Sequence, residues 1–240
     1  QRWRVADLVR RLGEHGAALP ELAAEDRSVV SAFALSYAQL AESQQRRFRL
    51  LGLHPGERFD VPAAAALTDL PLDDAEDLLD DLVDMHLVEE PEPGLFRLHD
   101  LMREYAATLA AADPDEVRHR ALLRLVDLHL HVAVRASDQV RTARRGGSAH
   151  LPEPLRPELL KAVADPIAWL ELQRPVLPKL ADAAVAAGRP EYAWGLPLAA
   201  WRFFDIRGYT DDIVATHRIG EAAARAAGDR TALAETVMRL

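Results

Sequence analysis

The chain has 240 residues, of which 49% are apolar and 28% are charged, and its formal charge is −9. This composition is typical of a folded protein with one large domain or two small ones, and excludes an intrinsically disordered chain. The acidic balance argues against a protein that coats nucleic acid or binds an anionic membrane surface.

Several kinds of site and segment are absent from the sequence. It contains no cysteine, which excludes a disulfide framework, a thiolate zinc site and a cysteine nucleophile. The longest uncharged stretch, residues 28–41, includes Ser31, Ser36 and Gln39 and is too short and too polar to cross a bilayer. The arginine-rich first ten residues do not form a signal peptide. We therefore expect a cytoplasmic protein without membrane contacts.

The N-terminal segment predicts a short amphipathic helix that ends at Gly13. Residues 3–12 place four apolar side chains at helical spacing: Val5, Leu8, Val9 and Leu12. Such a helix, with nothing before it to pack on, is typical of the last element of an upstream domain. Because the chain starts at Gln1 and ends at Leu240 within a helical pattern, we expect it to be a piece of a longer protein.

Residues 28–112 predict the order of elements found in a winged helix, a helix-turn-helix variant with an added β-hairpin. Apolar stripes over residues 29–40 and 48–53 predict helices, and His54-Pro55-Gly56 ends the second stripe. The expected later elements are a short helix over 62–67, a long helix over 73–85, strand-like runs over 87–90 and 95–98 joined by a turn at 91–94, and a helix over 101–111.

The C-terminal half predicts helices separated by a linker. A helix is expected over residues 116–135, and residues 141–157 are too rich in proline and glycine to sustain a helix or a strand. Helical patterns over 190–206 and 211–227 are separated by Arg207-Gly208. The segment 184–190 before them is echoed by 224–230, which gives a period of 40 residues. This period favours an α-solenoid. Prolines at 175, 178 and 197 predict kinks.

The long helix before the hairpin argues against DNA binding. It carries many acids and no lysine or arginine: Asp73, Asp74, Glu76, Asp77, Asp80, Asp81 and Asp84. Phosphates flank the major groove on both sides, so they would repel this helix. We expect no direct contact with nucleic acid. The acidic surface is either a solvated face or a docking face for a basic patch on a partner or adjoining domain.

Leu98-His99-Asp100 lies where the second strand leads into a helix. Helix N-termini favour anions, so His99 could donate a hydrogen bond to a phosphate. In the structural alternative, which the residues alone favour, Asp100 caps the helix and His99 packs in the core.

Catalytic motifs are missing. A metal-dependent phosphohydrolase would need further His and Asp residues near His99, and His129 and His131 lie on different helix faces. There is neither a G-x-x-x-x-G-K-[ST] phosphate loop nor a G-x-S-x-G elbow, so we expect no enzyme and no metal site. An aromatic cluster forms either solenoid core or a ligand groove: Trp194, Trp201, Phe203, Phe204 and Tyr209.

Four segments together resemble the winged-helix subdomain of actinobacterial STAND ATPases, which are NB-ARC-type regulators that include the Streptomyces antibiotic regulatory proteins (SARP type). These segments are Ser31–Tyr37, Phe48–Gly56, Leu82–Glu90 and Phe96–Ala106. Downstream, Ala168-Trp169-Leu170, Phe203–Tyr209 and Ala223–Asp229 resemble the start of the tetratricopeptide (TPR)-like sensor region of that family. Gln173 and Pro175 depart from the family pattern, which puts the local helix geometry in doubt.

This resemblance implies a mainly α fold, in which a winged helix with a small β-hairpin wing precedes an α-solenoid. Residues 1–27 would be the C-terminal tail of a helical (ARC1-like) subdomain and residues 28–112 the winged-helix domain. Residues 113–166 would be a connecting helix and Pro/Gly linker, and residues 167–240 the start of the TPR-like repeats.

The resemblance also implies the lid and sensor of a nucleotide-switched transcriptional regulator of antibiotic biosynthesis. The winged helix would close over ADP held by an upstream NB-ARC module, with DNA binding left to a separate effector domain. Leu98-His99-Asp100 matches the family's Met-His-Asp motif, so His99 would contact the β-phosphate of ADP and Asp100 would support it. Leu98 replaces the methionine.

The expected cofactor, ADP or ATP, would belong to the full-length parent and not to this fragment alone. Expected partners are the upstream module, an unknown protein or ligand on the repeats, and further copies of the parent on activation. The alternatives are a nucleotide-independent protein-interaction scaffold and a winged helix that binds DNA directly.

Overall fold

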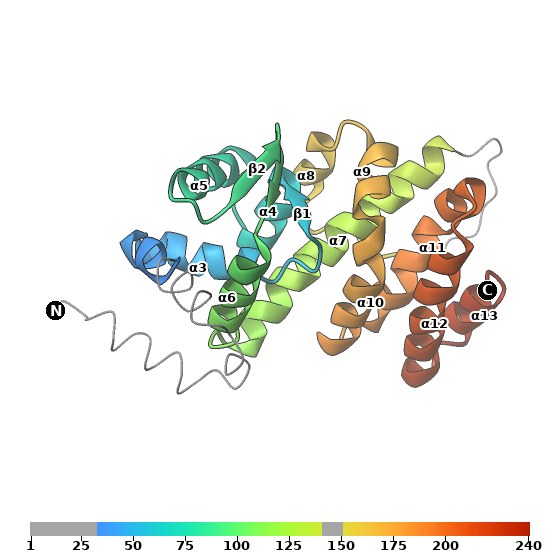
Figure 1. Cartoon of the computed structure of the whole chain (residues 1–240). Coiled ribbons are helices and arrows are strands. Elements are labelled where there is room, and N and C mark those ends of the chain that lie inside the picture. The colour runs from blue at the N-terminus through green and yellow to red at the C-terminus, as the bar shows by residue number, and fades with distance from the viewer. Residues whose placement is uncertain (1–32, 141–150) are drawn as a thin grey trace.

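The computed structural model describes residues 33–140 and 151–240 (Figure 1). The helix predicted over residues 3–12, the proposed ARC1-like tail and much of the predicted linker lie outside this range. The fold is mainly helical, with one small antiparallel sheet. No helix in the described part is both long and apolar enough to cross a membrane.

The N-terminal half confirms the predicted helices and hairpin. Residues 33–39 are helical. The elements that follow are α3 (Glu42–Leu51), β1 (Arg58–Asp60), α4 (Val61–Thr68), α5 (Leu72–Asp84), β2 (Glu89–Glu92), β3 (Leu95–Arg97) and α6 (Asp100–Ala110). The sheet has the order β1-β3-β2. Strand β1 was not predicted, because three residues are too few to show an alternating pattern.

The predicted positions of the first strand and of the hairpin turn were wrong by two residues. Leu87 and Val88 do not start the strand, since their backbone N–H groups both donate to the carbonyl of Leu82 at the end of α5. Pro91 lies within β2 and not in the turn. A proline is tolerated there because β2 is an edge strand. The turn itself depends on Gly94, whose φ is 74°.

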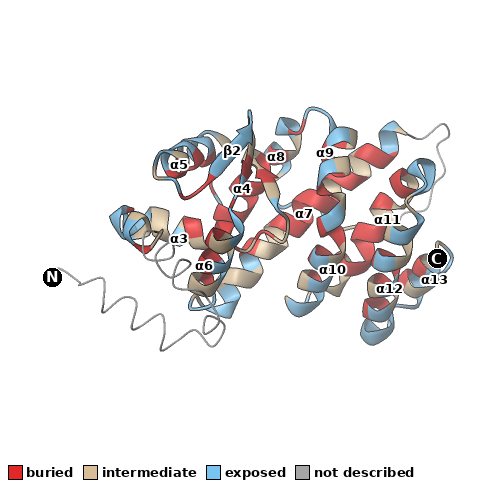
Figure 2. Ribbon diagram, viewed as in Figure 1, coloured by how far each residue is buried: buried red, intermediate tan, exposed pale blue. Residues whose placement is uncertain are grey.

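One long helix, α7 (Asp115–Gln139), connects the two halves. It packs against α4 on the N-terminal side and against three C-terminal helices, of which α9 spans Pro166–Gln173, α10 Leu177–Ala186 and α11 Pro190–Arg207. Figure 2 shows buried residues along much of α7. The helix predicted over 116–135 is therefore confirmed, and it extends further at its C-terminal end.

The predicted linker was wrong at its end, because α8 (Pro157–Ala162) starts there. Proline is favourable in the first turn of a helix, where its missing N–H has no partner to lose. Like Pro157, Pro175 and Pro178 lie at the start of a helical segment, so they do not kink a helix, contrary to the prediction. Pro175 lies in a 3-10 turn (Arg174–Val176) between α9 and α10, and Pro178 lies in the first turn of α10. Of these three prolines, Pro197 alone lies beyond the first turn of a helix, in α11.

The recurring glycines have the same structural role. Gly188, Gly208 and Gly228 have φ values of 70°, 74° and 72° and follow the ends of α10, α11 and α12 (Thr210–Ala227). A left-handed residue at a helix end favours glycine. Each of these helices packs against the next, and α12 packs against α13 (Arg230–Val237). Of the aromatic cluster, Trp194, Phe203 and Phe204 are buried in the core, as the core interpretation predicted.

Candidate functional site

The Leu98-His99-Asp100 segment joins β3 to α6. Leu98 is buried in the core, whereas His99 and Asp100 are exposed. His99 occupies the N-cap position of α6, without a hydrogen bond from its side chain to the helix. Asp100 is the first helical residue and pairs with Arg103. The structural alternative was therefore wrong in both respects, because Asp100 is not the cap and His99 does not pack in the core.

The start of α6 presents donors to its surroundings. The first backbone N–H groups of any helix have no partner within the helix. In α6 the first helical hydrogen bond runs from the backbone N–H of Arg103 to the carbonyl oxygen of His99, at 2.8 Å. The exposed residue His99 directly precedes these N–H groups, at the N-cap of α6. An anion at this position would meet both the helix N-terminus and the histidine.

Arg103 holds the start of α6 against a neighbouring turn. Besides its ion pair with Asp100, its Nη1 lies 3.4 Å from the carbonyl oxygen of Gly56. The backbone N–H of Gly56 in turn donates to Nδ1 of the buried His54 at 3.1 Å. The predicted helix-ending segment His54-Pro55-Gly56 thus lies close to the motif.

The described residues contain no group of His, Asp or Glu side chains that could hold a metal ion. His129 and His131 point to different partners. Nδ1 of His129 lies 2.8 Å from the carbonyl oxygen of Leu125, and Nε2 of His131 lies 3.5 Å from a carboxylate oxygen of Asp127.

Buried histidines make the stability of the protein depend on pH. Burial lowers the pKa of His129 to about 3 and the pKa values of His54 and His217 to about 4. In an unfolded chain these pKa values are about 6.5. Between about pH 6.5 and pH 4 the unfolded chain therefore binds protons that the folded chain does not, and the free energy of unfolding falls as the pH falls.

We expect the melting temperature to decrease on going from pH 7.5 to pH 5, and the decrease to be smaller in His129→Gln. Glutamine can still donate to the carbonyl of Leu125 but does not titrate. Thermal unfolding followed by circular dichroism in both proteins measures the difference. Equal pH dependence in the two proteins would contradict this account of His129.

Sequence reasoning missed an arginine-lined pocket of about 410 Å³ between α3, the end of α4 and α7. Its lining residues are Ser43, Arg46, Arg47, Leu50, Thr68, Asp69, Val117, Arg120 and Arg124. These residues come from three separate segments of the chain. The only signals in the sequence were the Arg46-Arg47 pair and the helical spacing of Arg120 and Arg124.

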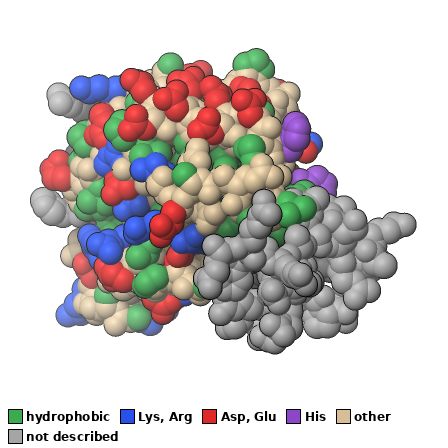
Figure 3. Space-filling view, turned by 90° about the vertical axis from the view of Figure 1, so that its left-hand side faces the viewer, with side chains coloured by type: hydrophobic (Ala, Val, Ile, Leu, Met, Phe, Trp, Pro, Cys, Tyr) green, Lys and Arg blue, Asp and Glu red, His purple; other side chains and the backbone are tan. Residues whose placement is uncertain are grey.

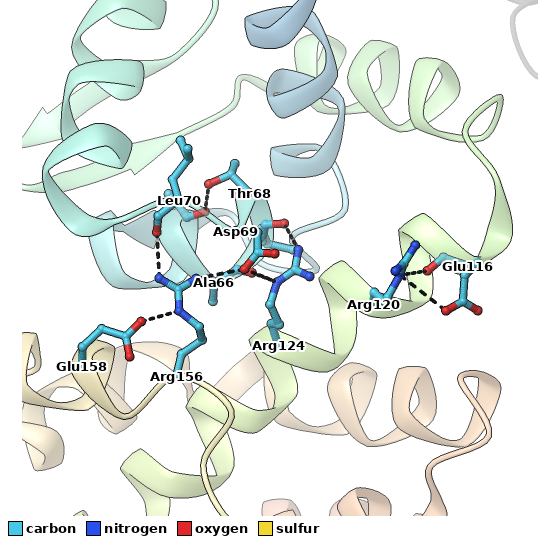
Figure 4. Close-up of polar contacts among 11 residues, drawn as sticks. Ala66, Thr68, Asp69, Leu70, Glu116, Arg120, Arg124, Arg156 and Glu158 are labelled. Atoms are coloured by element: carbon cyan, nitrogen blue, oxygen red, sulfur yellow. Dashed lines mark hydrogen bonds and ion pairs between the residues drawn. The ribbon is translucent and has the colours of Figure 1, made fainter.

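Two arginines cover the C-terminal end of α4 beside this pocket (Figure 4). Arg124, on α7, donates from Nε to the carbonyl of Ala66 at 2.7 Å and from Nη2 to that of Leu67 at 2.9 Å. Arg156, just before α8, donates to the carbonyl of Leu70 at 2.9 Å. Cations at this position complement the negative end of the helix dipole.

The acidic helix α5 presents its charges to solvent. Its buried residues are Ala75, Leu78, Leu79 and Leu82, and the seven acids predicted to form one surface are all exposed. Figure 3 shows acidic side chains gathered at the top of the face over α5. Asp81 accepts a hydrogen bond from Nε2 of Gln44 at 2.7 Å.

Comparison with known proteins identifies two relatives. The chain is 35% identical over 228 residues to the regulatory protein AfsR of Streptomyces griseus, a match that covers 94% of this chain and 23% of that protein. It is 44% identical over 137 residues to the regulatory protein AfsR of Streptomyces coelicolor, with coverage of 55% and 14%. The chain thus spans less than a quarter of the length of these relatives.

The chain is homologous to these proteins, which are named as regulatory proteins and not as enzymes. No protein-family profile matches the chain. No solved structure matches it either.

Proposed function

We propose that this chain is the lid and sensor part of a nucleotide-switched transcriptional regulator. The observation that carries the proposal is the exposed His99 at the N-cap of α6, in the motif that resembles Met-His-Asp. Homology to the AfsR regulatory proteins along 94% of the chain supports a role in transcriptional regulation.

The arrangement of the N-terminal half supports its interpretation as a winged helix. A helix, a strand, two helices and a hairpin follow one another, and β1 pairs with β3 to complete the sheet. The acidic α5 would occupy the position of a DNA-reading helix. Because it carries no cation, we propose that the winged helix is a lid and that a separate domain of the parent binds DNA.

In the proposed closed state, His99 donates a hydrogen bond to the β-phosphate of ADP held by an upstream NB-ARC module. The N–H groups at the start of α6 add donors, and the Asp100–Arg103 pair together with the Gly56 contact positions the turn. A hydrogen bond to a charged group contributes about 1.5–3 kcal/mol. This energy would favour the closed state over the open one by about 10- to 150-fold.

The helix pairs α10 to α13 support a TPR-like sensor region. Their antiparallel stacking, with left-handed glycines at the turns, is the arrangement expected of a solenoid. We propose that a protein or small ligand binds this region and changes the balance between closed and open lid.

The first test is whether a longer natural chain that includes the proposed NB-ARC module retains nucleotide. We expect ADP to be released when this protein, purified without added nucleotide, is denatured and its supernatant is analysed by ion-exchange chromatography. The absence of adenine nucleotide would favour the alternative of a nucleotide-independent interaction scaffold.

Direct DNA binding is tested with the 240-residue chain itself. We expect no retention on a column of immobilised duplex DNA at low salt, because α5 would be repelled by phosphates. Retention that falls steeply with added salt would overturn the lid interpretation of the winged helix in favour of DNA binding.

A further inference from the structure

We propose that the arginine-lined pocket between α3, α4 and α7 binds a small ligand that carries a diphosphate or triphosphate group. The lining contains four arginines, Arg46, Arg47, Arg120 and Arg124, and one acid, Asp69. An excess of positive charge in a pocket is unexpected in a chain of net charge −9.

Within the part of the chain that the structure describes, two of these guanidinium groups have no partner and can bind a ligand. Arg46 and Arg47 form no hydrogen bond or ion pair through their side chains with any residue in 33–140 or 151–240. They project from the same helix, α3, which is one wall of the pocket. Among the described residues, Arg120 pairs with Glu116 alone, four residues earlier on its own exposed helix face, a contact that contributes little. An anion would compete with it easily.

The carboxylate of Asp69 does not balance the positive charges of the arginines around it. Asp69 lies 3.6 Å from Arg124 and 3.1 Å from Arg156, so one carboxylate is shared by two guanidinium groups. Burial lowers the pKa of Arg124; the charge of Asp69 raises it in part, and the charges of Arg156 and Arg120 lower it further. These arginines repel one another, and a bound anion would relieve the repulsion.

The shape and chemistry of the pocket favour a compact phosphorylated compound. Its volume of about 410 Å³ lies in the range of small-molecule sites. The planar fork of arginine matches phosphate oxygens in a bidentate manner. Leu50 and Val117 provide apolar surface for the rest of a ligand, and Val117 lies in the first turn of α7, where the helix dipole favours an anion.

This site is distinct from the one proposed for the lid. His99 lies at the start of the 11-residue helix α6, whereas no residue of α6 lines the pocket. A ligand here would link α3 of the N-terminal half to α7, the helix that joins the two halves. Binding would therefore hold α3 and α7 together independently of any nucleotide in an upstream module.

The test is a calorimetric titration of the 240-residue chain with inorganic pyrophosphate at constant ionic strength. We expect Arg46→Gln/Arg47→Gln to weaken binding by at least about 10-fold, since each lost contact is a hydrogen bond between charged groups. The matched control is Arg218→Gln/Arg230→Gln, which removes the same charge from α12 and α13. We expect less than about a twofold change in this control and in His99→Ala.

Four results would overturn the proposal. If the wild type does not bind pyrophosphate, the proposal is wrong. If both double variants lose the same affinity for pyrophosphate, the binding is an unspecific attraction to charge. Equal affinity for orthophosphate and pyrophosphate would contradict the diphosphate class. Binding of an aspartate-rich peptide without binding of pyrophosphate would show instead a docking surface for an acidic protein segment. Thermal unfolding of each variant verifies that it is folded, and we expect both to fold because neither arginine side chain pairs with another residue in the described ranges.

Discussion

Replacing Asp127 with alanine is expected to lower the free energy of unfolding by about 3–5 kcal/mol. Asp127 is buried on α7 and accepts hydrogen bonds from the backbone N–H of Leu155 at 2.8 Å and from the hydroxyl of Tyr192 at 3.0 Å. His131 lies beside the same carboxylate. The buried Tyr192 hydroxyl and the partly buried N–H of Leu155 would both lose their acceptor, and each such loss costs about 1–3 kcal/mol.

Two further variants separate this effect from the general loss of a carboxylate. Asp127→Asn keeps one acceptor oxygen and is expected to cost less than alanine. Asp182→Ala removes an exposed acid from α10 and is expected to change stability by less than about 0.5 kcal/mol. Urea unfolding of the 240-residue chain, followed by circular dichroism, gives all three values. A loss below about 1 kcal/mol in Asp127→Ala would contradict the role assigned to this carboxylate.

Helices with clear periodicity could be predicted from the sequence to within a few residues. The apolar face of α5 and the glycines after α10, α11 and α12 are local signals, because each depends on residues close together in the chain. The short helix α4 was predicted from Pro62 in its first turn. Strand β1 was missed since its pairing with β3 depends on residues far away, as in the Phe59–Phe96 pair.

Contacts between the two halves could not be predicted for the same reason. The indole N–H of Trp169 donates to the carboxylate of Asp60 at 2.5 Å, although 109 residues separate them. Asp60 also caps α4 by accepting from Ala63 N. The sequence suggests the cap, because an acid precedes a proline-started helix, but carries no sign of the tryptophan. The arginine-lined pocket likewise depends on three segments that meet only in the folded chain.

The position of His99 in the fold was predicted in two ways. The resemblance pointed to His99, whereas the residues alone favoured a histidine in the core. A helix start at residue 101 would leave Asp100 as the cap. The helix starts at Asp100 instead, which makes His99 the N-cap residue and exposes it. A shift of one residue at a helix boundary thus made the core interpretation of His99 wrong, whereas its contact with a phosphate stays a prediction.

His99→Ala is expected to weaken ADP binding by about 10- to 150-fold in a longer chain that includes the proposed NB-ARC module. This range corresponds to the loss of one hydrogen bond of about 1.5–3 kcal/mol to a charged phosphate. The substitution should leave the stability of the 240-residue chain within about 0.5 kcal/mol of the wild type, because the side chain is exposed and caps nothing. Loss of affinity without loss of stability would be the signature of a ligand contact.

The most direct measurement is the dissociation constant of ADP for the wild type, His99→Ala and the control His119→Ala, each in that longer chain. His119 is a histidine of α7 outside the motif. The lid account predicts that only His99→Ala weakens binding, and by at least about 10-fold. Equal affinity in all three proteins would show that His99 does not contact the nucleotide and would contradict the proposed lid.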